Sequence, residues 1–145
     1  MRVDFWDRQL TLWARDQVGK PFSWGSTDCA ALVRAALHVM YGREMLPDLP
    51  TWSTLTEAIT VLQAHPVPDM LQQLGARVVA PNFERAGDIL LWKDPDHDQL
   101  PALGIRFSFN LLITDPAHGV TAPPSRNLTA AFRAAATAYR VPVDG

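Results

Sequence analysis

The sequence is poor in cysteine, since Cys29 is the only one among 145 residues. A single cysteine excludes an internal disulfide and a cysteine-based metal cage. The four histidines also lack the paired spacing that is typical of a zinc site; they are His38, His65, His97 and His118. We therefore expect neither a bound metal nor a cofactor.

The chain also lacks an excess of charge of one sign and any long hydrophobic run. It has 13 basic and 15 acidic residues, a formal net charge of −2 and no cluster of lysine or arginine, which argues against nucleic-acid binding. No stretch approaches the ~20 apolar residues that span a bilayer, so we expect no membrane insertion. Asp4 and Asp7 interrupt the region where a signal peptide would be apolar. We expect no signal peptide, and folding in the cytoplasm or export by another route.

The composition is that of an ordinary globular domain, with 48% hydrophobic and 19% charged residues, and we expect a single domain over residues 1–145. Helical periodicity is followed by short apolar runs between turn residues. This order predicts an α+β fold in which N-terminal helices pack on a small antiparallel sheet. Helices are expected over 3–18, 28–41, 54–65, 69–74 and 128–138, and strands over 77–80, 89–92, 103–109, 111–114 and 119–121, with an edge strand over 139–142.

Cys29 lies at the start of the expected helix 28–41, directly after a Trp-Gly turn. The first turn of a helix carries unpaired N–H groups and a partial positive charge, which favour a thiolate nucleophile. However, Cys29 also belongs to the apolar face of this helix, and free cysteine is commonly a small buried hydrophobe. Spacing alone leaves both interpretations open.

Three segments resemble the NlpC-type cell-wall cysteine peptidases. Residues 19–33, GKPFSWGSTDCAALV, resemble the catalytic-cysteine segment of that family, "G-x-P-[YF]-x-W-G" followed by "D-C-[SA]-x-L-[VF]". Residues 85–92, RAGDILLW, resemble its "P-G-D-L-[VL]-F-F" strand, and residues 101–105, PALGI, resemble the histidine-bearing strand "x-H-V-G-I-Y". The resemblance implies a circularly permuted papain-like fold, with the helix of Cys29 packed on the sheet.

The chain departs from this family where the histidine is expected, because Ala102 occupies that position. A cysteine peptidase needs a base within hydrogen-bond reach of its sulfur, and alanine cannot accept a proton. The family's third polar position falls near Thr114 or Asp115. The remaining candidate bases are His97, in a polar loop, and His118, which could fold back toward the sulfur; a solvated role in a loop is the alternative for both.

The resemblance implies a cleft around Cys29 with Trp24, Asp28, Ala102 and Thr114 in its wall. Short stand-alone chains of this shape resemble a branch encoded near phage tail genes. We therefore expect a structural component of a phage tail tip or baseplate, with other tail-tip proteins as partners, assembled in the bacterial cytoplasm and located in the virion tail. Two alternatives stay open: an active peptidoglycan endopeptidase that uses Cys29, and a module that binds cell-wall fragments, with Trp24 as a stacking wall.

Overall fold

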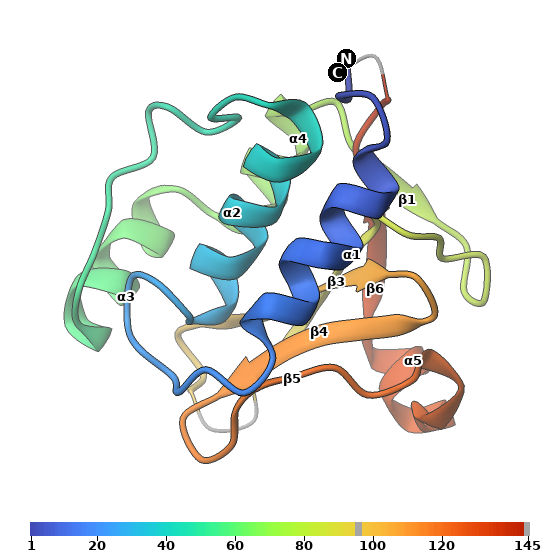
Figure 1. The fold of residues 1–145 in the computed structure, drawn as a ribbon. Coiled ribbons are helices and arrows are strands. Elements are labelled where there is room, and N and C mark those ends of the chain that lie inside the picture. The colour runs from blue at the N-terminus through green and yellow to red at the C-terminus, as the bar shows by residue number, and fades with distance from the viewer. Residues whose placement is uncertain (95–96, 144–145) are drawn as a thin grey trace.

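The computed structural model describes residues 1–94 and 97–143, and its centre is an antiparallel sheet (Figure 1). The strand order is β1-β6-β2-β3-β4-β5. Every neighbouring pair is antiparallel, and β3 lies between β2 and β4. The strands are β1 Arg77–Val79, β2 Ile89–Lys93, β3 Pro101–Phe107, β4 Asn110–Asp115, β5 Gly119–Thr121 and β6 Thr137–Arg140.

The helices that precede β1 cover one face of this sheet, as the sequence predicts, and the helix that precedes β6 packs on the opposite face. The helices are α1 Trp6–Gln17, α2 Cys29–Tyr41, α3 Leu55–Ala64, α4 Val67–Gln73 and the short α5 Ala130–Ala135, and a 3-10 turn covers Ser125–Asn127. Helix α2 packs on β3 and β4 and is flanked by α1 (Figure 1). Within the described residues, no helix is both long enough and apolar enough to cross a membrane. The predicted α+β fold, with helices on an antiparallel sheet, is confirmed.

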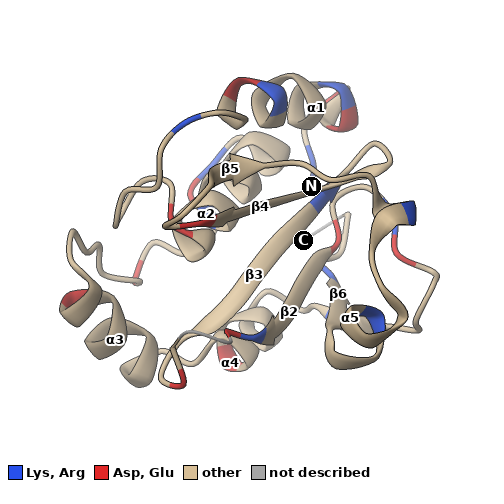
Figure 2. Ribbon diagram, turned by 90° about the horizontal axis from the view of Figure 1, so that it is seen from below, with Lys and Arg blue, Asp and Glu red and all other residues tan. Residues whose placement is uncertain are grey.

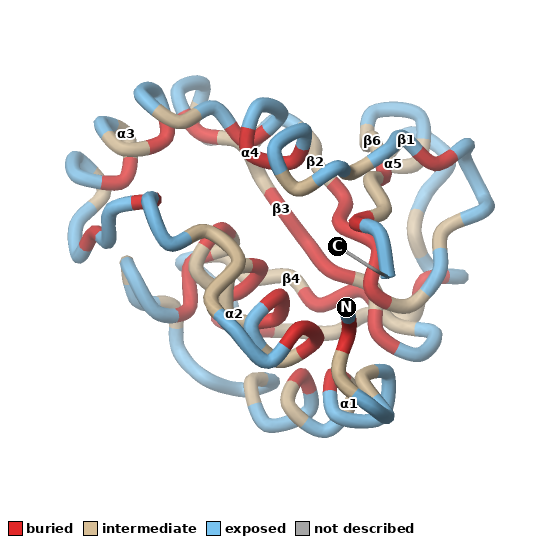
Figure 3. Tube along the Cα trace, turned by 90° about the horizontal axis from the view of Figure 1, so that it is seen from above, coloured by how far each residue is buried: buried red, intermediate tan, exposed pale blue. Residues whose placement is uncertain are grey.

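Two apolar clusters hold the layers together, and Figure 3 shows buried segments along β3 and on the helices that face it. The larger cluster lies between the helices and the sheet, where Leu37 and Met40 of α2 meet Ile105 of β3. The smaller cluster lies on the opposite face of the sheet. It includes Leu90 and Leu111, and Phe132 of α5 packs against it. Alternate residues of a strand point to opposite faces, so β2 contributes to both clusters through Ile89 and Leu90.

The last strand corrects a prediction. Residues 139–142 were expected at the sheet edge because proline cannot donate to a ladder. Instead β6 pairs with both β1 and β2 and lies inside the sheet. It ends at Arg140, so Pro142 follows the strand and removes none of its hydrogen bonds. The helix expected over 128–138 is shorter for the same reason, since Thr137 and the following residues are drawn into the sheet.

A buried ion pair fixes β6 beside β2. Asp88 is completely buried, and its carboxylate accepts hydrogen bonds from Arg140 Nε and Nη2 at 2.9 and 2.8 Å. The Asp88 side chain also accepts the backbone N–H of Arg85 at 2.8 Å. The hydrogen bonds with Asp88 raise the pKa of Arg140, which stays charged. The Gly-Asp pair at the start of β2 therefore has a structural role.

Candidate functional site

Cys29 is the first residue of α2, and its sulfur lies beside the beginning of β3. The Cys29 thiol donates a hydrogen bond to the backbone carbonyl oxygen of Pro101, with the sulfur 3.7 Å from that oxygen. A thiol can donate only while it carries its proton. The contact therefore stabilises the neutral form of Cys29.

The pKa of the Cys29 thiol is raised, whereas the pKa of an activated, nucleophilic cysteine is lowered. Burial, aided by the negative charges of Asp28 and Asp94, raises the pKa of the thiol to about 12. The backbone amides of Leu103 and Ala30 oppose this change and do not overcome it. The start of a helix favours a thiolate, and in this structure desolvation outweighs that preference. Of the two interpretations that the sequence leaves open, the raised pKa favours the small buried hydrophobe.

Asp28 belongs to the framework around the sulfur. One oxygen of its carboxylate accepts the backbone N–H of Ala31 at 3.0 Å and caps α2. The other oxygen accepts the backbone N–H of Gly25 at 2.6 Å and the indole N–H of Trp52 at 2.8 Å. Asp28 is 3% exposed, and its bond with Trp52 is buried, while those with Gly25 and Ala31 are partly buried. Helix capping and these two further bonds thus account for the aspartate that precedes Cys29.

Trp52 is a residue that the sequence interpretation missed. It lies in the connector before α3, is buried, and ties that connector to Asp28. The bond spans 24 positions of the chain, and no local spacing near Trp52 points to it. A buried indole N–H requires an acceptor, which would have justified a search for a buried carboxylate.

The Trp-Gly turn requires glycine at position 25. Gly25 has φ +87°, which is left-handed, and an added Cβ would overlap the carbonyl oxygen of Trp52. The Ser23 carbonyl oxygen accepts the backbone N–H groups of Ser26, Thr27 and Asp28. The turn therefore delivers Asp28 to the beginning of α2 in one fixed orientation.

A cleft of about 370 Å³ opens beside the sulfur. Its walls come from the turn before α2, from α3, from the segment between β2 and β3, and from β4 with the turn that follows it. The structure brings together in this cleft all the site residues predicted from the sequence: Trp24, Asp28, Cys29, His97, Ala102, Thr114 and His118.

Ala102, which occupies the position of the histidine in the NlpC-type segment, lines the same cleft as Cys29. It follows Pro101, whose carbonyl oxygen contacts the Cys29 sulfur, and it pairs with Trp92 of β2. The backbone at residues 101–102 thus lies next to the sulfur. The methyl group of Ala102 cannot act as a base. Thr114 also lines the cleft, and its buried hydroxyl oxygen has no hydrogen-bond partner within the described part of the chain.

His118 forms a pair with Asp115 at the turn between β4 and β5. Its Nδ1 lies 3.0 and 3.1 Å from the two carboxylate oxygens of Asp115. Burial disfavours the charged carboxylate, but the backbone N–H groups of His118 and Ala117 and the His118 ring together lower the pKa of Asp115. The His118 side chain is 74% exposed. Among residues 1–94 and 97–143, the hydrogen bonds of Cys29 include none to the imidazole of His118 or His97.

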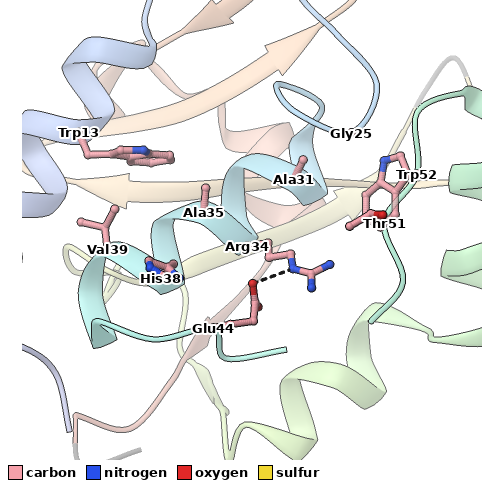
Figure 4. A pocket seen from close by; sticks show the side chains of 10 residues that line it. All are labelled: Trp13, Gly25, Ala31, Arg34, Ala35, His38, Val39, Glu44, Thr51 and Trp52. Carbon is pink, nitrogen blue, oxygen red and sulfur yellow. Dashed lines mark hydrogen bonds and ion pairs between the residues drawn. The ribbon is translucent and has the colours of Figure 1, made fainter. Parts of the chain in front are cut away.

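A second pocket of about 430 Å³ lies along the other side of α2, between Trp13 of α1 and Trp52 (Figure 4). Its charged residues are already paired, since Arg34 Nε lies 3.2 Å from a Glu44 carboxylate oxygen. The Arg34 guanidinium also donates to the backbone carbonyl oxygens of Leu46 and Leu49, each at 3.0 Å. Arg34 therefore fastens the connector 44–49 to α2.

No group of three or more histidine, cysteine, aspartate or glutamate side chains within 1–94 and 97–143 is arranged to hold an ion.

Comparison with known proteins identifies a similar fold and a matching family. No curated protein matches the chain. Among solved structures, the crystal structure of the NlpC/p60 domain of the peptidoglycan hydrolase SagA is similar, with a TM-score of 0.53 and 17% identity, covering 91% of this chain and 96% of that one. The chain thus has an NlpC/p60-like fold, and the circular permutation stays a prediction. Residues 1–134 match the family described as "Domain of unknown function (DUF6950)", and the chain therefore belongs to that family.

Proposed function

We propose that this chain is an NlpC/p60-like domain without hydrolytic activity, which serves as a structural component of a phage tail tip or baseplate. In this proposal the papain-like architecture is retained as a scaffold, and the cleft beside Cys29 does not turn over peptide bonds. Other tail-tip proteins would be its partners, and the domain would be assembled in the bacterial cytoplasm and carried in the virion tail.

One observation carries the loss of activity: the Cys29 thiol donates to a carbonyl oxygen where a peptidase would place a base. A catalytic cysteine needs a neighbouring group that takes or holds its proton. The Pro101 carbonyl oxygen accepts from the protonated thiol at 3.7 Å, and position 102 offers only a methyl group. Burial and the two nearby carboxylates further disfavour the thiolate.

The placement in a phage tail rests on the sequence resemblance. The segments 19–33, 85–92 and 101–105 together resemble short stand-alone chains of a branch encoded near phage tail genes. The cysteine itself is compatible with a scaffold role, because it lies on the apolar face of α2 and packs against the main core cluster. A small apolar side chain is all that this packing requires.

The second candidate function is an active peptidoglycan endopeptidase, and the Asp115–His118 pair favours it. A histidine oriented by a carboxylate is the usual form of a catalytic base, and both residues line the cleft that contains Cys29. Against it, the ring is largely exposed and its recorded partner is Asp115, not the sulfur. The third candidate is the cell-wall fragment binding module; it shares the cleft and needs no base.

Peptidoglycan digestion separates these functions. Purified wild-type protein, Cys29→Ala and His118→Ala are incubated with peptidoglycan sacculi, and soluble fragments are measured by mass spectrometry. We expect the same background release from all three proteins, because the thiol is protonated and has no base. Release by the wild type that disappears in Cys29→Ala would overturn the proposed function, and its loss in His118→Ala as well would establish the endopeptidase.

Restoring the histidine is expected to reactivate the thiol in part. Ala102→His adds an imidazole to the wall of the cleft that also contains Cys29, and an imidazolium that reaches the sulfur stabilises the thiolate. We predict an increase of about tenfold or more in the rate of Cys29 alkylation by iodoacetamide at neutral pH. Ala102→Gln, which adds a side chain of similar length without a titratable group, is the control. An equal increase in both variants would show that access, and not the base, limits the reaction.

A further inference from the structure

Folding gathers arginines that are scattered along the sequence onto one part of the sheet. Arg106 of β3 pairs with Leu111 of the smaller cluster, and paired residues of neighbouring strands share a face, so Arg106 lies on the face opposite α2. Arg140 of β6 lies on that face as well, because residues two apart in a strand share a face and Ala138 belongs to the same cluster. Helix α5 packs on this face and adds Arg133, its basic segment in Figure 2.

Two further arginines border this group. Arg77 of β1 is exposed and lies directly across the ladder from Arg140. Arg126 is also exposed and follows Ser125, whose carbonyl oxygen accepts a hydrogen bond from Arg133 Nη2 at 2.6 Å. No two of these arginines are neighbours in the sequence, so the fold alone brings them together. We call them the arginine surface: Arg77, Arg106, Arg126, Arg133 and Arg140.

The nearby carboxylates neutralise the arginine surface only in part. Asp88 is occupied by Arg140, which donates to both of its oxygens. Glu84 Oε1 lies 3.8 Å from Arg133 Nη1, and the Glu84 side chain is 10% exposed. Among the described residues, the negative charges that act on Arg106 are those of Glu84 and Asp88. The guanidinium groups therefore outnumber the carboxylates.

Arg106 has no paired carboxylate among the residues that the structure describes. Its guanidinium donates one hydrogen bond there, from Nη2 to the carbonyl oxygen of Ser108 at 3.2 Å, and its buried Nε has no partner. Burial, together with the positive charge of Arg133, lowers the pKa of Arg106, although two carboxylates act in the opposite direction. The fold thus leaves positive charge at Arg106 that a carboxylate from outside would neutralise.

Two exposed phenylalanine side chains border the arginine surface. Phe83 is 69% exposed, and its backbone carbonyl oxygen accepts a hydrogen bond from Arg140 Nη2 at 3.1 Å. Phe109 is 79% exposed, and its carbonyl oxygen accepts the backbone N–H of Ser125 at 2.8 Å. Aromatic and arginine side chains are those that protein interfaces favour. The surface therefore offers apolar contacts as well as positive charge.

We propose that the arginine surface, with Phe83 and Phe109, is a docking site for an acidic segment of a protein partner, in which aspartate or glutamate alternates with apolar residues. Carboxylates suit it because guanidinium groups bind them through paired, charge-assisted hydrogen bonds. A nucleic-acid backbone suits it less, since Glu84 lies beside Arg133 and the whole chain has a formal net charge of −2.

The arginine surface is separate from the cleft beside Cys29. None of its residues belongs to the described lining of that cleft. Strand β3 connects the two places, because it begins at Pro101 in the cleft wall and bears Arg106 near its other end. The inference therefore goes beyond the proposed function and does not depend on whether Cys29 is active.

Three fluorescein-labelled peptides test the preference: Ala-Glu-Leu-Asp-Leu-Glu-Ala-amide, its counterpart with glutamine and asparagine in place of the acids, and its counterpart with lysine. Binding to the full chain is measured by fluorescence anisotropy at neutral pH. We expect the acidic peptide to bind about tenfold more tightly than the amide peptide, as for two partly exposed ion pairs. The lysine peptide should bind most weakly, and added salt should reduce the preference.

Charge removal at the surface supplies the first variant. Arg106→Gln with Arg126→Gln should abolish the preference for the acidic peptide. The control, Lys20→Gln with Lys93→Gln, removes the same charge from β2 and from the segment beside β5, away from this surface, and should leave the preference intact. Phe109→Ser alters only an exposed side chain and keeps the test valid if the loss of Arg106 disturbs the fold. It should weaken binding of the acidic peptide by about threefold or more.

The inference fails if the three peptides bind equally, if none binds measurably, or if the acidic preference survives in folded Arg106→Gln with Arg126→Gln. Tighter binding of single-stranded oligothymidine than of the acidic peptide would also overturn it and would assign the surface to nucleic acid. Cys29→Ala should bind the acidic peptide as the wild type does. Peptidoglycan digestion reports on the proposed function separately, so either proposal can fail alone.

Discussion

Replacement of Asp28 by alanine is expected to lower the free energy of unfolding by about 3–5 kcal/mol, from the loss of a helix cap, of the buried hydrogen bond with Trp52 and of the partly buried one with Gly25. The substitution removes the acceptor of the Ala31 amide and leaves the N–H groups of Gly25 and Trp52 unpaired. Urea denaturation followed by far-ultraviolet circular dichroism measures the effect.

Thr129→Ala is the matched control for Asp28→Ala. Thr129 caps α5 by accepting the backbone N–H of Phe132 at 3.1 Å, but it is exposed, and its side chain makes no second hydrogen bond within the described residues. Its loss should cost about 1 kcal/mol, the usual value for an exposed cap. If Asp28→Ala costs no more than Thr129→Ala, the network around Trp52 does not hold the turn, and the structural explanation of Asp28 fails.

Replacement of Gly25 by alanine is expected to destabilise the fold by about 3 kcal/mol or more, because a left-handed backbone penalty is added to a steric overlap. The overlap is with the Trp52 carbonyl oxygen, which is backbone and cannot rotate away. Relief would require the connector of Trp52 to move, and that movement would also weaken its bond with Asp28. Thermal and urea denaturation both measure the change.

Gly19→Ala separates the two contributions. Gly19 has φ +91°, close to that of Gly25, yet an added Cβ would meet nothing within 4 Å. It should therefore show only the conformational penalty of about 1–2 kcal/mol. Equal losses of stability in the two variants would mean that the contact between the turn and the connector of Trp52 is not tight.

The sequence predicts the helices and most strands because their patterns are local. The apolar face of α2, the capping pair Thr54 and Glu57 at the start of α3, and the change to short apolar runs after Gly75 are each visible within a few residues. The place of β6 could not be predicted in this way. It depends on pairing with β1 and β2 and on the bond between Arg140 and Asp88, which spans 52 positions.

The sequence indicated which residues line the cleft, but it did not indicate the protonation state of the Cys29 thiol. The order of three segments brings Cys29, Ala102 and Thr114 into one cleft, as expected. The protonation of the thiol depends on burial and on the charges of Asp28 and Asp94, and neither can be derived from the helix position alone. The helix start and the buried setting act in opposite directions, and only the packed structure shows that burial prevails.

The pH dependence of Cys29 alkylation in the folded protein tests this account most directly. With a pKa raised to about 12, the alkylation rate should keep increasing with pH well above about 8.5, the pKa of free cysteine, where the rate for free cysteine begins to level off. At neutral pH it should be lower than that of the urea-unfolded chain by about three orders of magnitude, in proportion to the thiolate fraction. A rate that instead reaches its plateau below neutral pH would reveal an activated nucleophile and contradict the account.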